Sequence, residues 1–313
     1  MTSSAVMSSP PGVPLLGDQE PRLCSLPEYD RDDSGRNAVA LAAIAGLNLD
    51  PWQRFVLEAG LRRRGDRWAA FEVCLIVARQ NGKGSVLEAL ELAALFLFPD
   101  VRLILHSAHQ FKTAAEAFLR IRALIEQNPD LESRVSRIRT AAGAEAIELK
   151  DGKRLRFVAR SSGSGRGFTT DLVILDEAYE LGNGEMSALL PTLTARPDPQ
   201  VWYTSTAGGP QSVQLGRVRN RGIAGADRSL AFMEWSVDEA AYDPADPRDW
   251  ARANPGLGIR IRPEFIEQER PALGPEGFAR ERLSIGDYPV EGGSWETISA
   301  DAWDACAAPG ARL

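Results

Sequence analysis

Residues 71–87, FEVCLIVARQNGKGSVL, change character twice within a short distance. An apolar run, VCLIV, ends at the polar loop ARQNGKGS, and an apolar helical pattern then resumes. In that pattern apolar residues recur at the spacing of one helical face, at Val86, Leu87, Leu90, Ala94 and Leu97. The stretch therefore predicts a buried strand, a tight polar turn, and a helix that packs on the sheet.

The polar loop nearly matches the phosphate-binding pattern G-x-x-x-x-G-K-[ST]. Gly82 and Lys83 hold the G-K positions, but Val77 stands at the first glycine and Gly84 at the final hydroxyl, with Ser85 one step later. The physical requirements are still met, because a strand ends, backbone N–H groups turn toward one point, and a helix begins beside a lysine. The alternative is an ordinary basic turn between a strand and a helix.

A second apolar run, Leu172–Leu175, leads directly into Asp176 and Glu177. Two adjacent carboxylates at the end of a buried strand are costly unless they are used or paired. In a phosphate-loop NTPase, Asp176 would hold Mg²⁺, directly or through water, and Glu177 would orient and polarise the attacking water. An acidic strand-to-helix cap is the alternative, but the loop at Gly82 and Lys83 supplies the other half of the same mechanism.

A third run, VWYTSTAGG at 201–209, ends in hydroxyls and glycines. Ligands of parallel sheets gather at the carboxyl ends of the strands, so Thr204, Ser205 or Thr206 is a candidate sensor of the terminal phosphate. An ordinary polar turn is again the alternative. The long interval between Lys83 and Asp176 leaves room for an intervening strand, as in RecA-like motors.

Short apolar runs alternate with helical patterns from about residue 70 to residue 206, which predicts an α/β fold with a mostly parallel sheet between helices. The expected strands are 71–78, 101–106, 145–149, 154–159, 171–175 and 200–204, and the expected helices are 36–47, 84–97, 110–127, 184–194, 263–270 and 276–283. A hairpin at Asp151–Gly152 interrupts the alternation. We divide the chain into a disordered leader at 1–35, a RecA-like (ASCE) P-loop core at 36–209, a small α-rich lid at 210–290 and a linker at 291–313.

The composition of the 313 residues, with 44% hydrophobic residues and a net charge of −7, argues against a uniformly basic nucleic-acid coat. The candidates for local basic patches are 61–67, LRRRGDR, and 216–222, GRVRNRG, with solvated arginines as the alternative. No apolar run reaches the roughly 18 residues that would span a bilayer. His106 and His109 lack evident partners for a zinc site or a catalytic triad, so we interpret them as polar residues that end a strand.

Taken in order, these segments resemble those of the large terminase subunit of tailed double-stranded-DNA bacteriophages, a DNA-packaging motor. LDPWQRFVLEAGL at 49–61 looks like the family's adenine-side segment, and ARQNGKGS at 78–85 is similar to its deviant phosphate loop. GSGRGFTTDLVILDEAYE at 163–180 resembles the approach to the acidic pair. TSTAGG at 204–209 looks like the coupling motif, and WARANPGLG at 250–258 resembles a segment that follows the ATPase core.

The resemblance implies ATP hydrolysis with Mg²⁺ and the roles of particular residues. It assigns nucleotide binding to Gln53, Arg79, Gln80, Asn81, Gly82, Lys83, Gly84 and Ser85, with Gln53 reading the base. It assigns the metal to Asp176 and Ser85, and coupling to Thr204, Ser205 and Thr206. It assigns catalysis to Glu177 and Lys83, with Arg79 and Arg166 as candidates for stabilising transition-state charge within one subunit or between two.

The resemblance also implies partners and a setting. These are double-stranded DNA, a portal protein, a small terminase subunit and a homo-oligomeric ring, for which five subunits is the preferred number; no membrane partner is implied. The expected location is the procapsid portal in the host cell cytoplasm. A C-terminal nuclease domain would follow the linker at 291–313 and is absent from this chain.

Two other functions are compatible with the motifs. A helicase-like DNA-remodelling ATPase also uses a glutamine segment and an Asp-Glu strand. A non-hydrolysing nucleotide-binding scaffold would follow if Gly84, which removes the usual metal-binding hydroxyl, had disabled the metal site.

Overall fold

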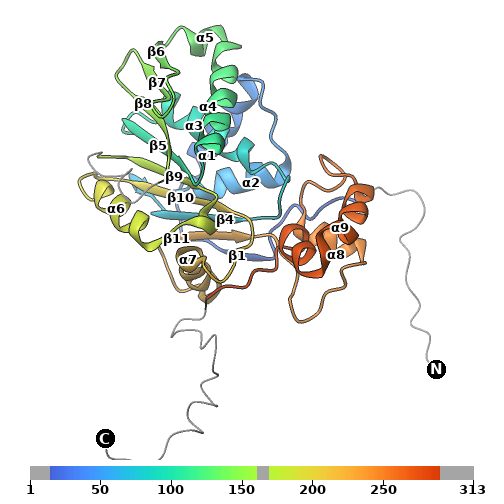
Figure 1. Ribbon diagram of the computed structural model, residues 1–313. Coiled ribbons are helices and arrows are strands. Elements are labelled where there is room, and N and C mark those ends of the chain that lie inside the picture. Colours follow the sequence, from blue (N-terminus) through green and yellow to red (C-terminus); the bar gives the residue numbers. More distant parts are fainter. Residues whose placement is uncertain (1–14, 161–168, 290–313) are drawn as a thin grey trace, which may run out of the picture.

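The computed structural model describes residues 15–160 and 169–289, and its centre is a nine-stranded sheet in the order β1-β11-β4-β10-β9-β5-β8-β7-β6 (Figure 1). The strands are β1 (Leu23–Ser25), β4 (Glu72–Ile76), β5 (Leu103–Ala108), β6 (Val135–Arg139), β7 (Ala146–Leu149), β8 (Arg154–Ala159), β9 (Leu172–Asp176), β10 (Gln200–Ser205) and β11 (Leu230–Glu234). A separate hairpin joins β2 (Arg63–Arg64) to β3 (Arg67–Trp68).

The six strands from β11 to β8 run parallel, and antiparallel strands stand at both edges. Because β4, β10 and β9 are neighbours and parallel, their carboxyl ends lie side by side. The register pairs Thr204 with Asp176 and Ser205 with Ile76. The alternating pattern of the sequence therefore predicted the mostly parallel sheet correctly, and the hairpin at Asp151–Gly152 joins β7 to β8.

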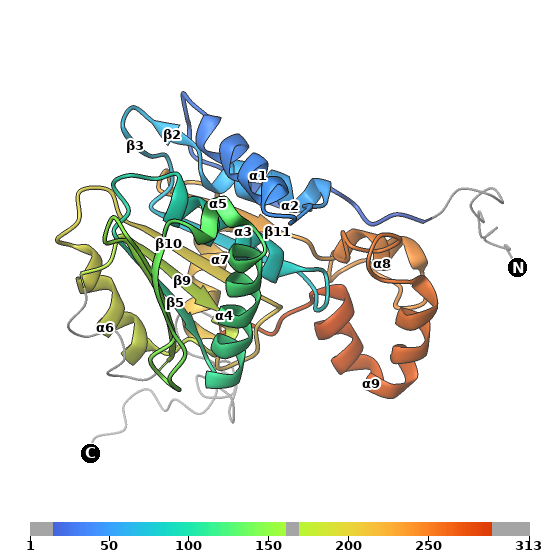
Figure 2. The same cartoon turned by 90° about the horizontal axis from the view of Figure 1, so that it is seen from above.

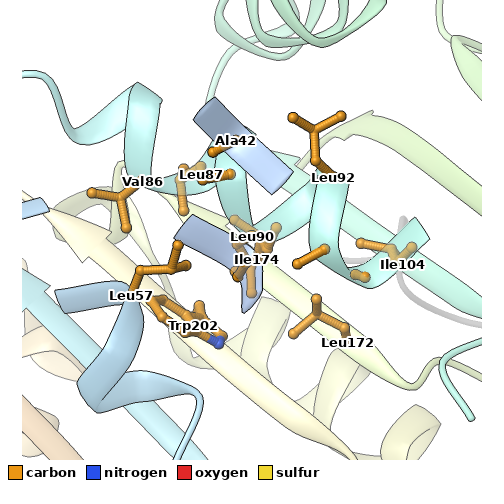
Figure 3. Close-up of a cluster of buried hydrophobic side chains, with 14 of the residues drawn as sticks. Ala42, Leu57, Val86, Leu87, Leu90, Leu92, Ile104, Leu172, Ile174 and Trp202 are labelled. Carbon is orange, nitrogen blue, oxygen red and sulfur yellow. The ribbon is translucent and has the colours of Figure 1, made fainter. Parts of the chain in front are cut away.

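Helices cover both faces of the sheet (Figure 2). One face is covered by α1 (Asp33–Ile44), α2 (Pro51–Gly60), α3 (Lys83–Phe96) and α4 (Phe111–Glu126), and the other by α6 (Asn183–Leu193) and α7 (Val213–Ala224). Alternate strand residues enter the two cores, so Ile174 packs with the first set of helices and Leu175 with the second. Figure 3 shows part of the first core, where Leu87 and Leu90 of α3 lie close to Ile174 and Trp202 of the sheet.

Helix α3 is buried along nearly its whole length, which differs from the expected one-sided face. Helices α1 and α2 pack against α3 on the side that faces away from the sheet (Figure 2). They therefore bury the residues of α3 that do not contact the sheet. Leu97, which was expected on the buried face, is 38% exposed at the end of the helix. A buried helix of this kind carries its polar residues, Glu88 and Glu91, into the interior as well.

The remaining helices are α5 (Pro129–Glu132), the 3-10 turn η1 (Ala178–Glu180), α8 (Pro247–Ala253) and α9 (Pro263–Leu283). Helices α8 and α9 form a small lobe beside the sheet, with its own apolar core around Trp250 and Phe278 (Figure 1). A break at Gly274, where φ is +69°, divides α9 and corresponds to the two helices expected at 263–270 and 276–283. Within the described residues, no helix is both long and apolar enough to cross a membrane.

Two of the expected boundaries are wrong. Strand β11 and helix α7 lie inside the interval 210–290 but belong to the main domain, because β11 pairs with β4 and α7 packs on the sheet. The leader was placed at 1–35, but β1 adds an antiparallel edge strand beside β11, and Gly17 N–H donates to Leu257 O of the small lobe. The edge strand β1 is too short for a clear pattern, and the inner strand β11 lies in a region of changed composition, so their pairing with other strands is what reveals them.

Candidate nucleotide site

A cavity of about 390 Å³ opens where the carboxyl ends of β4, β9 and β10 meet the start of α3. It is lined by Arg79, Gln80, Gly82, Lys83, Gly84, Ser85, Glu88, Arg120, Asp176, Glu177, Tyr179, Ser205 and Thr206. The ammonium of Lys83 and the carboxylates of Asp176 and Glu177 therefore share one cavity, as the sequence predicted. Most of the predicted site residues line it with them.

The loop between β4 and α3 turns through two left-handed backbone positions, Gln80 with φ +63° and Gly82 with φ +98°. A Cβ at residue 82 would also lie 2.7 Å from Nε2 of Gln53, so glycine is required on both counts. Helix α3 begins immediately afterwards at Lys83. In its first turn the N–H of Ser85 donates to the carbonyl of Gly82 at 3.2 Å, which leaves the N–H groups of Lys83 and Gly84 to face an anion in the cavity.

Lys83 provides the positive charge at the floor of this cavity. Its Nζ donates to the carbonyl of Val77 at 3.1 Å. Burial lowers the pKa of Lys83 to about 8, although the nearby carboxylate of Asp176 acts in the opposite direction. The side chain is thus an ammonium that stays charged near neutrality and that gains from an incoming polyanion.

The acidic pair is held by the sheet. Oδ1 of Asp176 accepts hydrogen bonds from the hydroxyl of Thr204 at 2.8 Å and from the N–H of Glu177 at 2.9 Å. Glu177 has a left-handed backbone, with φ +54°, and its Oε1 accepts from Thr113 of α4 at 3.4 Å. Its Oε2 is buried and has no partner among the described residues. A buried carboxylate oxygen without a partner points to a water or ligand position.

Arg160, which the sequence reasoning missed, supports this turn from β8. It is 8% exposed, and its guanidinium donates to the carbonyls of Asp176 at 2.6 Å, Glu177 at 2.9 Å and Ser107 at 3.0 Å. Burial lowers its pKa, and the carboxylates of Asp176, Glu185 and Glu177 oppose that shift. The sequence feature that could have revealed Arg160 is its position directly after the predicted strand 154–159, since the ends of parallel strands, including the one before Asp176, meet at one edge of the sheet.

Two residues that were expected to bind nucleotide do not line the cavity. Gln53 is fully buried, and its amide accepts from the N–H of Asp50 at 2.8 Å and donates to the carbonyl of Gly82 at 2.8 Å. Gln53 therefore closes the capping box of α2 and holds the loop from behind, so this arrangement gives no support to base reading by its side chain.

Asn81 also points away from the cavity. It is fully buried, donates to the carbonyl of Ala78 and to Oδ1 of Asn254, and accepts from the N–H of Gly256 at 2.8 Å. Asn254 and Gly256 belong to WARANPGLG, so this motif anchors the phosphate loop to the small lobe. The arrangement therefore gives no support to a nucleotide contact by the side chain of Asn81, which does not line the cavity.

The candidate arginines differ in position. Arg79 lines the cavity with a side chain that is 58% exposed and pairs with Glu281 of α9 at 3.4 Å. Arg166 lies outside the described residues. In the coupling motif, Thr204 bonds to Asp176, while Ser205 and Thr206 line the cavity, and within the described part of the chain the buried hydroxyl of Ser205 has no partner.

Of the two histidines, only His109 follows the end of a strand as predicted, since β5 ends at Ala108. His106 lies within β5, fully buried, and its Nδ1 is 2.5 Å from Oε1 of Glu91. Burial by itself would lower the pKa of His106, but the carboxylate of Glu91 raises it overall. The pair is a structural contact between α3 and β5.

The polar groups around the cavity suit Mg²⁺ that arrives with a nucleotide. Mg²⁺ in phosphate sites is usually held by one or two carboxylates, together with phosphate oxygens and water. Asp176 and the hydroxyl of Ser85 face the same cavity, and among the described residues no cluster of three or more metal-ligating side chains competes for the ion. The residues present therefore fit this ion.

The strand order and the position of the loop and acids define a RecA-like ATPase fold. The sequence pattern of the family described as terminase large subunit, ATPase domain, matches residues 51–221. The chain belongs to this family, and the resemblance proposed from its motifs is confirmed. A search of curated proteins found no match.

Solved structures show the same fold. The large terminase of bacteriophage HK97 is 20% identical with a TM-score of 0.69, over 80% of this chain and 55% of that one. The ATPase domain of the Thermus phage P74-26 large terminase is 17% identical with a TM-score of 0.53, over 78% of this chain and 96% of that domain. The chain thus spans about half of the HK97 protein and nearly all of an isolated ATPase domain.

Proposed function

We propose that this chain binds ATP in the cavity and hydrolyses it in a Mg²⁺-dependent reaction that drives double-stranded DNA into a phage procapsid. The observation that carries the proposal is the convergence of Lys83, Asp176 and Glu177 on one cavity at adjoining strand ends. Membership of the terminase ATPase family supports it. So do solved structures of a thermophilic bacteriophage large terminase with ADP and with ATP-γ-S, which share the fold at a TM-score of 0.50.

In this proposal the loop binds the phosphates. The N–H groups at the start of α3 and the ammonium of Lys83 surround the terminal phosphates, and a bound phosphate chain raises the pKa of Lys83 back toward its ordinary value. Asp176 and Ser85 are the residues that would hold Mg²⁺, which supplies charge neutralisation at the phosphate oxygens when it is bound.

Glu177 is the proposed general base. Its unpartnered Oε2 accepts the hydrogen bond, and then the proton, of the attacking water, while Thr113 holds its other oxygen and Arg160 holds its carbonyl. Arg79 is an exposed cation at the cavity and is the proposed stabiliser of transition-state charge, together with Arg166. Thr204 links the acid to the coupling motif through its bond with Asp176.

Partners and location form part of the proposal. The chain would act in a ring at the portal of a procapsid in the host cytoplasm, together with a small terminase subunit and a nuclease domain. Contacts with DNA phosphates would be insensitive to sequence and sensitive to salt.

The test is a pair of variants measured for ATP binding and for phosphate release with Mg²⁺ and DNA. Glu177→Gln should lower turnover at least about a hundredfold with near-normal ATP affinity, because only the base is lost. Lys83→Ala should instead lose ATP binding. Glu180→Gln, which changes a nearby acid outside the cavity, is the matched control. Unchanged turnover in Glu177→Gln would remove Glu177 from this role, and unchanged binding in Lys83→Ala would remove the site.

A further inference from the structure

Gly84, the departure from the phosphate-loop pattern, has a cation lying over it. A Cβ built on Gly84 would lie 3.3 Å from Nη2 of Arg120 and 3.5 Å from Oε1 of Glu88. A side chain at residue 84 would therefore lie in close contact with a guanidinium from α4, which would have to shift by a few tenths of an ångström, and in ordinary contact with a carboxylate from α3. Both residues line the same cavity as Lys83 and Asp176.

Arg120 is held in a defined orientation. Its Nε donates to Oε1 of Glu88 at 2.6 Å, and the Glu88 side chain is 9% exposed whereas that of Arg120 is 47% exposed. Within the described residues its two Nη atoms have no hydrogen-bond partner. A guanidinium anchored through Nε presents its remaining donors in a planar fork, the arrangement that suits phosphate oxygens.

The position of Arg120 on α4 indicates which phosphates it faces. Thr113 and Arg120 are seven residues apart and so lie on one face of the helix. Thr113 contacts Glu177, the proposed base, and Arg120 lies over the loop position beside Lys83. This face of α4 is thus directed at the end of the cavity where the terminal phosphates would lie.

We propose that Arg120 binds the terminal phosphates of the nucleotide, that Glu88 positions it, and that Gly84 is the residue that makes room for it. The inference rests on the proposed function and extends it. Glycine at this position then reflects a different way of providing phosphate contacts, in which a fixed cation replaces a side-chain hydroxyl.

The first experiment measures ATP and AMP affinity by calorimetry in Mg²⁺ and in EDTA. Arg120→Ala should weaken ATP about tenfold or more under both conditions, since a charge-assisted contact to phosphate needs no metal, and should leave AMP affinity unchanged. Arg122→Ala is the matched control, because Arg122 lies on the same helix and pairs with Glu126 away from the cavity. Thermal unfolding confirms that each variant is folded.

The second experiment separates positioning from metal binding. Glu88→Ala should lose more ATP affinity than Glu88→Gln, because glutamine keeps an oxygen acceptor for Nε of Arg120. Neither variant should raise the Mg²⁺ concentration that half-maximal ATP turnover requires. A raised Mg²⁺ requirement in Glu88→Gln, together with normal ATP affinity in Arg120→Ala, would make Glu88 a metal ligand and overturn the inference.

The third experiment is a double-mutant cycle between residues 84 and 120. Gly84→Ser should weaken ATP binding in the native chain, because the new side chain displaces Nη2, and should have little effect beside Arg120→Ala. Tighter ATP binding in Gly84→Ser would contradict the proposal.

The variants Arg120→Ala and Lys83→Ala together separate this inference from the proposed function. Normal ATP affinity in Arg120→Ala, with ATP binding lost in Lys83→Ala, would overturn this inference alone. Normal ATP affinity in both variants would overturn the proposed function.

Discussion

The two halves of the cavity are held in place by different parts of the molecule. The acid half, Asp176 and Glu177, is supported from within the sheet and α4 by Thr204, Arg160 and Thr113. The loop half is supported from outside the sheet. Gln53 of α2 holds the carbonyl of Gly82, and the small lobe holds the rest, through Asn254 and Gly256 on Asn81 and Arg282 on the carbonyl of Arg79.

This difference predicts a division of labour. Movement of the small lobe would act directly on the loop that is proposed to bind phosphates, while the base and its neighbours keep the geometry of the sheet. Changes in the loop's supports should therefore alter binding and stability, and changes in the support of the acids should alter turnover.

The largest expected effect comes from removing the link between the loop and the small lobe. Asn81→Ala leaves the N–H of Gly256 without its acceptor and Oδ1 of Asn254 without its donor, and both groups are buried. We expect the free energy of unfolding to fall by about 2–4 kcal/mol, measured by denaturant titration. Asn37→Ala, at an exposed position on α1, is the control and should change it by less than about 0.5 kcal/mol. A loss of that small size in Asn81→Ala would show that the link carries no stability.

The acid half can be weakened without touching the loop. Thr204→Val keeps the shape of the side chain but removes the hydroxyl that donates to Asp176. We expect turnover to fall about tenfold, since hydrogen bonds to charged groups contribute about 1.5–3 kcal/mol, with ATP affinity within about twofold. Thr192→Val removes another buried hydroxyl, away from the cavity, and controls for stability. A loss of affinity rather than turnover would contradict the division.

Gln53 distinguishes support of the loop from recognition of the base. Because its amide bonds to Asp50 and Gly82, Gln53→Ala should weaken ATP and GTP by the same factor, about three- to tenfold. Equilibrium binding of both nucleotides measures that ratio. A loss confined to ATP would restore Gln53 to the role of reading adenine.

The smallest effect is the dependence of binding on pH. Burial lowers the pKa of Lys83 to about 8, and a bound phosphate chain raises it, so binding takes up protons and affinity falls as pH rises. We expect about a twofold loss between pH 7 and pH 8, with proton uptake visible by calorimetry in buffers of different ionisation enthalpy. Lys83→Arg should not show this dependence, since arginine stays charged.

Much of the fold followed from apolar runs. Continuous runs such as Leu172–Leu175 are typical of strands that are buried on both faces, and each of the six predicted runs forms a strand. Three strands of the main sheet were missed. Strand β1 is very short, β6 (VSRIR) is largely exposed and carries two arginines, and β11 lies in a region of changed composition. Their places in the sheet depend on pairing, of β1 with β11, of β11 with β4 and of β6 with β7, which no local pattern records.

The site was predictable only in part. Lys83, Asp176 and Ser205 were placed correctly at the cavity because residues that follow parallel strands must meet at one edge. Asn81 and Gln53 were given the wrong direction, since the side chain of a loop residue follows from backbone angles and distant partners. Arg120 and Glu88 were missed because each lies inside an ordinary helix.

The sequence alone therefore determined the order of strand, loop, helix and acidic strand, because apolar runs and helical periodicity are local patterns that can be read from residue types. Which polar side chains face the nucleotide cavity was decided by the tertiary structure. Asn81 is turned inward by Asn254, and Arg120 is brought over Gly84 by the packing of α4 beside α3. The physical reason is that a hydrogen bond or ion pair has a direction and a partner, and both are supplied by segments far away in the chain.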